Sequence, residues 1–179
     1  MYPLILIFKI LLALIALLLV TAAFVKKEYS VVRTVTINKP VSIVFDYVKH
    51  LNNQTQYSIW TMRDPQAKTT TKGIDGTVGF IASWDSKNSQ VGKGEQEIIG
   101  LDENKKVDIR LQFYKPFNCA ASANFVTNDM GDGSSEIAWT FNGSMPYPFN
   151  IMRVFTSIDK MIGKDLQDGL NNVKSILEK

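Results

Sequence analysis

The chain has little of the chemistry that cysteine and histidine provide, with one of each among 179 residues. A single cysteine excludes an internal disulfide and a metal cage built from several thiolates. A single histidine without a Gly-x-Ser-x-Gly motif gives no basis for a serine-histidine-aspartate device. We therefore assign no catalytic residue, no metal and no cofactor. We expect His50 to lie at the surface or to cap a helix end, and Cys119 to be a small buried hydrophobe.

A surplus of charge is also missing from most of the chain. The net charge is +3 at pH 7, and Lys9, Lys26, Lys27 and Arg33 against Glu28 account for all of it. The remainder is neutral, so it lacks the electrostatic footprint that nucleic acids require. We predict no nucleic-acid partner.

One segment almost lacks polar side chains. Residues 4–25 are apolar apart from Lys9 and Thr21. As a helix this run extends roughly 33 Å, enough to cross the hydrocarbon core of a bilayer. We interpret it as a retained single-pass membrane anchor in contact with lipid. A cleaved signal peptide is the alternative, because the small residues at 20–23 resemble a processing site.

The basic residues after this run indicate a boundary and an orientation. Lys26 and Lys27 are suited to lipid headgroups and favour a cytoplasmic location for the C-terminal domain. We divide the chain into an anchor with its basic junction, 1–28, and a folded domain, 29–179.

The folded domain has the pattern of an α+β protein. Residues 41–50 have helical spacing of apolar side chains, and 51–56 hold further helical turns. From Ile151 onward, apolar residues recur every three or four positions and predict one long helix of about 28 residues. Strands are predicted, from β-branched content or period-two alternation, over 29–38, 67–72, 78–84, 91–101, 106–114, 119–127 and 135–143.

This order of elements predicts a curved antiparallel meander of six or seven strands with the long helix across its concave face. Gly163 and Gly169 lie inside that helix. Each costs roughly 1 kcal/mol against alanine, so we expect a bend or a close approach to the sheet there.

Several stretches in this order are similar to those of a known superfamily. They are TINKPVSIVFDYV, SIWTMRDP, KGIDGTVGFIASWDS, VGKGEQEI and IDKMIGKDLQDGLNNVK. Over about residues 30–179 the chain resembles the START-like, polyketide cyclase/dehydrase (SRPBCC) superfamily, whose fold is the helix-grip. The resemblance implies a hydrophobic ligand held between the sheet and the long helix.

Aromatic and thioether side chains are the candidate ligand contacts. Strand parity places Phe80 and Trp84 on the inner face and Asp85, Glu95 and Glu97 on the outer face. Packing alone explains such residues equally well, and the resemblance favours a cavity. The candidate lining residues are Trp60, Met62, Phe80, Trp84, Phe113, Trp139, Phe141, Met152, Phe155 and Met161.

The sequence therefore predicts a membrane-anchored domain that binds a small hydrophobic molecule, such as a lipid or a polyketide-like compound. A cyclase or dehydratase acting in the same cavity is the alternative, with Tyr57, Tyr114 and Tyr147 as the tyrosines to test. A protein-interaction module at the membrane is a third possibility, and no protein partner is indicated.

Overall fold

The computed structural model, which describes residues 2–179, is built around a seven-stranded antiparallel sheet in the order β1-β7-β6-β5-β4-β3-β2. From β2 to β7 each strand pairs with the next one along the chain, and β1 pairs with β7, so the predicted meander is confirmed. The strands are β1 (Glu28–Ile37), β2 (Lys68–Lys72), β3 (Ile81–Asp85), β4 (Lys93–Asp102), β5 (Lys106–Lys115), β6 (Cys119–Asp129) and β7 (Ser135–Ser144).

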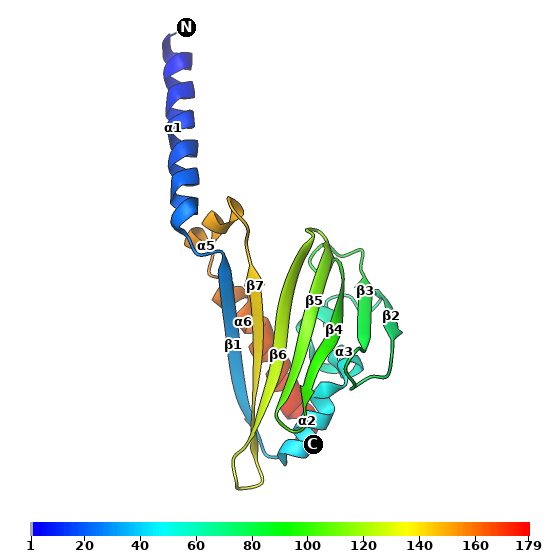
Figure 1. The fold of residues 1–179 in the computed structure, drawn as a ribbon. Coiled ribbons are helices and arrows are strands. Elements are labelled where there is room, and N and C mark those ends of the chain that lie inside the picture. Colours follow the sequence, from blue (N-terminus) through cyan, green and yellow to red (C-terminus); the bar gives the residue numbers. More distant parts are fainter. Residues whose placement is uncertain (1) are drawn as a thin grey trace.

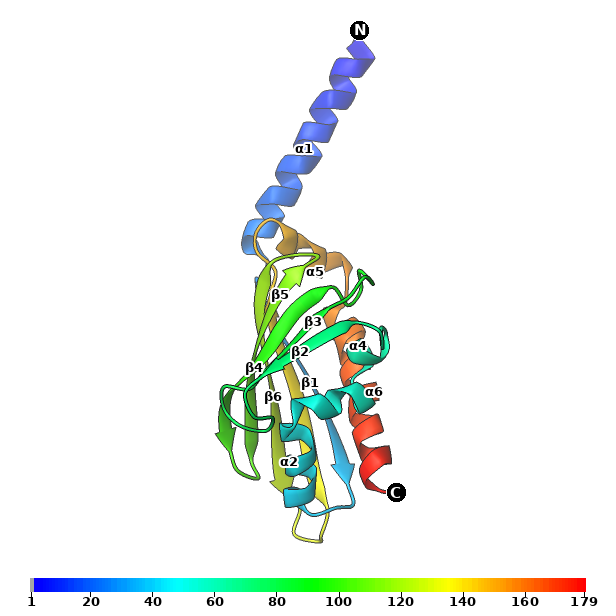
Figure 2. The same cartoon turned by 90° about the vertical axis from the view of Figure 1, so that its right-hand side faces the viewer.

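Helices cover one face of this sheet, which Figure 2 shows from the side. They are α2 (Val41–Lys49), the 3-10 turn η1 (Leu51–Asn53), α3 (Gln54–Tyr57), α4 (Ile59–Met62) and α6 (Ile158–Leu177). At the end of α2 the His50 Nδ1 lies 2.7 Å from the Asp46 carbonyl oxygen, which confirms the predicted capping role. This arrangement is the predicted α+β fold, a curved sheet around a long C-terminal helix.

The long helix is shorter than the sequence predicts. Instead of one helix from Ile151, the chain forms η2 (Phe149–Ile151) and α5 (Met152–Phe155), and then breaks before the 20-residue α6. Thr156 has extended backbone angles, and the Ser157 hydroxyl accepts a hydrogen bond from the Lys160 amide. The extended Thr156 ends α5 and Ser157 caps α6, and the apolar spacing alone reveals neither.

Two further boundaries differ from the prediction. The predicted strand from Val78 begins only at Ile81, because Gly76 and Gly79 have positive φ angles of 79° and 88° and form a turn. The segment after Ser58, which lies outside the helices and strands that the sequence predicts, starts with the single helical turn of α4.

Both glycines of α6 lie where the helix comes closest to the sheet, as the sequence predicts. A Cβ added at Gly169 would lie 2.8 Å from the Trp139 ring, and one at Gly163 would lie 2.0 Å from the Arg33 guanidinium. Next to them, α6 buries Leu166, Leu170 and other apolar residues in the core. Close approach therefore explains both glycines.

Helix α1 (Tyr2–Phe24) projects away from the sheet (Figure 1). Its segment Pro3–Phe24 is long and apolar enough to cross a membrane, and none of its most apolar window is buried. The part of the sheet where β1 begins is called the α1 end below. The opposite end carries the hairpin around Gly131 and is called the far end.

The junction between α1 and the domain is hydrogen-bonded. The Asn150 side chain is fully buried, and its Nδ2 donates to the carbonyl oxygens of Ala22 and Val25, both at 2.7 Å. The Arg153 guanidinium donates to the carbonyl oxygens of Lys26 and of Glu28, the latter at 2.8 Å. These bonds fix the last turn of α1 to the segment between β7 and α6.

Candidate functional site

The inner face of the sheet is sealed at the far end and open at the α1 end. Along β6, the inward positions go from exposed Cys119 through half-buried Ala121 to buried Ala123 and fully buried Phe125. Cys119 was expected to be buried, and the structure corrects this. It has inward parity, but it lies at the first residue of the strand, beyond the part that the helices cover.

Neighbouring strands show the same gradient. On β5, Phe113 is partly buried while Ile109 and Val107 are fully buried, and on β7, Phe141 is partly buried while Ile137 is fully buried. Three adjacent strands therefore expose their inner face only toward the α1 end.

The sealed half is filled with aromatic side chains. The Tyr57 ring lies 5.8 Å from the Trp139 ring and 6.5 Å from the Phe125 ring, both edge to face. The Tyr57 hydroxyl is fully buried and meets no hydrogen-bond partner in the described chain. The nearby Gln54 amide oxygen instead accepts from Gln96 Nε2 at 3.0 Å. Burial raises the pKa of Tyr57 far above its usual value, so the hydroxyl stays protonated.

The open half contains Trp60, Trp84, Phe113 and Phe141, all partly buried against the core. Trp84 and Phe113 pack edge to face with ring centres 5.9 Å apart, and Trp60 packs in the same way on Trp139 at 6.0 Å. Together they form an apolar wall that still meets solvent.

Two contacts hold the Trp84 indole in this wall. Its Nε1 donates to the Val91 carbonyl oxygen at 3.2 Å. Its ring also lies so close to Gly94 that a Cβ there would be 2.6 Å away. Gly94 therefore makes room for the Trp84 ring, a close approach that the alternation of residues along the strands does not identify.

The ten predicted lining residues fall into three groups. Phe80 and Trp139 are buried in the core, whereas Trp60, Trp84, Phe113 and Phe141 are partly buried on its inner side. The other four are at least half exposed and are not enclosed between sheet and helix, which corrects their expected position: Met62, Met152, Phe155 and Met161. For Met152 and Phe155 the reason is the break before α6, which turns these two residues out of the predicted helical stripe.

Sequence reasoning missed several partly buried residues beside the open half, among them Ala121, Met145 and Ile162. An alanine does not indicate a position that lines a ligand site, because alanine is common in strands and helices alike. Met145 follows β7 directly, and no periodic pattern extends to it. Only Ile162, on the apolar stripe of α6, carried a signal that could have found it.

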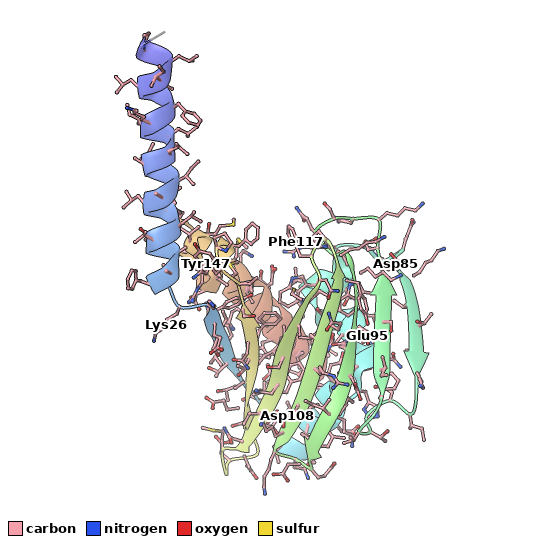
Figure 3. All side chains as sticks on the ribbon, turned by 45° about the horizontal axis from the view of Figure 1, so that its top comes forward. Lys26, Asp85, Glu95, Asp108, Phe117 and Tyr147 are labelled. Atoms are coloured by element: carbon pink, nitrogen blue, oxygen red, sulfur yellow. The ribbon has the colours of Figure 1, made fainter. Side chains whose placement is uncertain are left out.

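Carboxylates lie on the outer side, as predicted. The Lys93 ammonium donates to Asp85 at 2.9 Å and holds the pKa of that carboxyl below its usual range. Glu97 pairs with Arg110, and Figure 3 shows Asp85 and Glu95 away from the inner wall. Within residues 2–179 no group of three or more histidine, cysteine or carboxylate side chains is placed to hold a metal ion.

Two hollows lie on the surface at the α1 end. One, of about 220 Å³, is apolar and lies between the last turns of α1 and residues 148–152. The other, of about 570 Å³, has a mixed polar and apolar lining, and Asp85, Lys87 and Lys115 are among its lining residues. Neither lies between the sheet and α6.

Comparisons with known proteins support the fold. No protein-family model and no curated protein sequence matches the chain. Among solved structures, it is similar to protein CV1439 from Chromobacterium violaceum, with a TM-score of 0.58 and 9% identity over 84% of this chain and 97% of that one.

Two other solved structures are also similar. DynU16, a putative protein in the dynemicin biosynthetic locus, has a TM-score of 0.58 and 13% identity over 84% of this chain and 47% of that one. Ara h 8.0201 has a TM-score of 0.52 and 13% identity over 85% of this chain and 99% of that one. At these identities the likeness concerns the fold alone, and the chain has the helix-grip fold.

Proposed function

We propose that this protein is a membrane-anchored helix-grip domain that binds a small hydrophobic molecule, a lipid or a polyketide-like compound, on the open half of its inner face. The observation that carries the proposal is the burial gradient on β5, β6 and β7. A face built only for packing would be sealed along its whole length. Here the aromatic wall around Trp84 and Phe113 remains partly exposed.

The energetics favour an apolar occupant. Covering roughly 200 Å² of apolar surface contributes about 5 kcal/mol before the entropic cost of association is subtracted. One whole aromatic side chain has about that area, and the open half contains four that are only partly buried. On the outer face, Asp85 is paired with Lys93 and Glu97 with Arg110. These carboxylates are therefore not placed to bind a charged ligand on the inner face.

The anchor belongs to the same proposal, with residues 1–28 in and at the membrane and residues 29–179 outside it. Asn150 supports a retained helix over a cleaved signal peptide. Processing after residue 22 or 23 would remove the Ala22 carbonyl that this buried amide binds, and would leave its other acceptor, Val25, next to a new chain terminus. Lys26 and Lys27 support a cytoplasmic domain through the basic-loop bias.

A matched pair of variants tests ligand binding. Ala121 lies on the inner side of β6 and its neighbour Ala120 on the exposed outer side. We expect Ala121→Trp to fill the open half and Ala120→Trp to leave it free. Native mass spectrometry of the full chain, released from detergent micelles, should recover a bound apolar molecule with wild type and Ala120→Trp and lose it with Ala121→Trp. Recovery of no such molecule from any of the three would refute the proposal.

One observation favours a catalytic role on the same face. The Tyr57 hydroxyl stays protonated and is buried in the sealed half, so it is suited to donate a hydrogen bond to a carbonyl of a substrate that extends there from the open half. Tyr114 and Tyr147 are more than 40% exposed and do not share this environment. A cyclase or dehydratase would bind unconverted substrate in Tyr57→Phe. Equal masses of the molecules bound by wild type and variant would contradict this alternative.

A further inference from the structure

The exposed apolar side chains at the α1 end form a surface that the ligand proposal does not use. We define the apolar rim as Phe117, Tyr147, Phe149, Met152, Val154 and Phe155, all between 46% and 77% exposed. Five of the six come from the segment between β7 and α6. Figure 3 shows Phe117 and Tyr147 at the same end of the domain as Lys26.

The composition of that segment fits a lipid surface. Residues 145–157 read MPYPFNIMRVFTS and contain no acidic residue and one basic residue, Arg153. The Arg153 guanidinium is occupied by backbone carbonyl oxygens of the junction and lies over the Tyr29 ring at 5.8 Å. Lys26 and Lys27, both exposed, flank the rim. Apolar side chains next to cations are typical of segments that lie in a membrane interface.

Contacts with α1 set the depth of the rim. Phe149, Ile151 and Met152 line an apolar groove together with Ile15 and Leu19 of α1. At 1.5 Å per residue, these two α1 residues lie roughly 13 Å and 7 Å along the helix from Phe24. Two rim residues, Phe149 and Met152, therefore lie beside apolar turns of α1 that are closer to the middle of that helix than its last residue, Phe24.

The length of α1 restricts the depth at which the rim can lie in the bilayer. The apolar segment Pro3–Phe24 is about 33 Å long, and the hydrocarbon core of a bilayer is about 30 Å thick. A helix that crosses the core must keep its last turns inside or at the edge of the core. The residues packed against those turns must then meet the headgroup and upper acyl region.

The Asn150 side chain keeps the rim at this depth in the bilayer. Its two hydrogen bonds hold the η2 turn (Phe149–Ile151) against the last turn of α1, and Arg153 of α5 holds the chain that leads into β1. A flexible linker would allow the domain to hang free in water, whereas this junction fixes its α1 end toward the bilayer.

We infer that the apolar rim docks onto the leaflet that α1 enters, with Asn150 as the positioning residue, so that the open half of the inner face lies against lipid headgroups. This inference rests on the membrane anchor of the proposed function but not on ligand binding. The partner is a lipid surface, and its acyl chains fill the apolar groove beside α1.

Depth-dependent quenching tests the inference. The full chain, with Cys119→Ser as background, is placed in phosphatidylcholine and phosphatidylglycerol vesicles with a nitrobenzoxadiazole label at Phe155→Cys. Ile74→Cys is the matched control, because Ile74 is 74% and Phe155 75% exposed and Ile74 lies in the turn between β2 and β3. Spin-labelled acyl chains should quench the label at position 155 at least about threefold more strongly than the label at position 74.

Three outcomes would overturn the inference. Equal quenching at the two positions would place the rim in water. A blue shift at position 155 that grows with protein density without quenching would identify a protein interface instead. Unchanged quenching in Asn150→Leu, where we expect a clear fall with unaltered tryptophan emission, would show that Asn150 does not position the rim.

The same vesicles separate this inference from the proposed function. Alkaline extraction reports whether α1 is anchored, and native mass spectrometry reports whether a ligand is bound. Anchored chain with bound ligand and an unquenched label would overturn docking alone. Anchored chain with a quenched label and no ligand would overturn ligand binding alone.

Discussion

Alanine at the two glycines of α6 is expected to have unequal effects on stability. Gly169 faces the Trp139 ring in the sealed half, where an added Cβ has no room. Gly163 faces the Arg33 guanidinium, the far end of a flexible side chain that can move aside. The pair compares a rigid contact with a yielding one in the same helix.

The magnitudes can be worked out from the contacts. Replacing glycine by alanine inside a helix favours folding by about 1 kcal/mol, and this gain is common to both sites. At Gly169 overpacking against a buried indole costs about 1–3 kcal/mol. At Gly163 the cost is a disturbed ion pair between Arg33 and Asp159, a solvent-exposed contact that water screens, so it offsets only part of the gain. We therefore expect Gly169→Ala to be less stable than Gly163→Ala by about 1–2 kcal/mol.

Urea unfolding in detergent micelles measures this difference. The three tryptophans, Trp60, Trp84 and Trp139, report on the inner side of the domain. Equal stability of the two variants would mean that the far half of the inner face has free space. It would refute the division into a sealed half and an open half.

Three further predictions concern single side chains. Tyr57→Phe should raise the free energy of unfolding by about 1 kcal/mol in urea titrations, because it removes a buried hydroxyl that has no partner; a loss would indicate a hidden hydrogen bond. Cys119 should react fully with a maleimide without denaturant, and more slowly at neutral pH than a free thiol, because partial burial raises its pKa; a need for urea would contradict the open α1 end. Asp159→Asn should lower stability at pH 7, because the Arg33 hydrogen bond lowers the pKa of Asp159. Since a lowered folded-state pKa stabilises only above the unfolded value, the difference from wild type should shrink as the pH falls below 3.8 in acid titrations of unfolding; a constant difference would refute this assignment.

Much of the fold could be predicted from the sequence because its signals are local. The alternation in Lys106–Tyr114 and the β-branched run of β1 fix strands and their inward faces, and the apolar stripe of α6 fixes its buried side. The break at Thr156 and Ser157 escaped prediction, because the apolar spacing continues across a short extended segment.

The site was less predictable because exposure depends on where the covering helices end. Cys119 and Phe125 share one face of one strand, yet the first is exposed and the second fully buried. The alternation of residues along a strand indicates which face of the sheet a side chain lies on. It does not indicate how far that side chain lies from the end of the sheet that the helices leave uncovered. The role of Asn150 could not be predicted from the sequence either, because its partners are backbone carbonyl oxygens more than 120 residues away.

The most direct test of ligand binding on the inner face is photolabelling of the full chain in lipid vesicles with a fatty acid that carries a diazirine in mid-chain. We predict adducts, mapped by peptide mass spectrometry, on the open inner face at Trp84, Phe113, Ala121 or Phe141, and a loss of these adducts in Ala121→Trp. Adducts confined to α1 and residues 145–157, with none on the inner face, would contradict binding there.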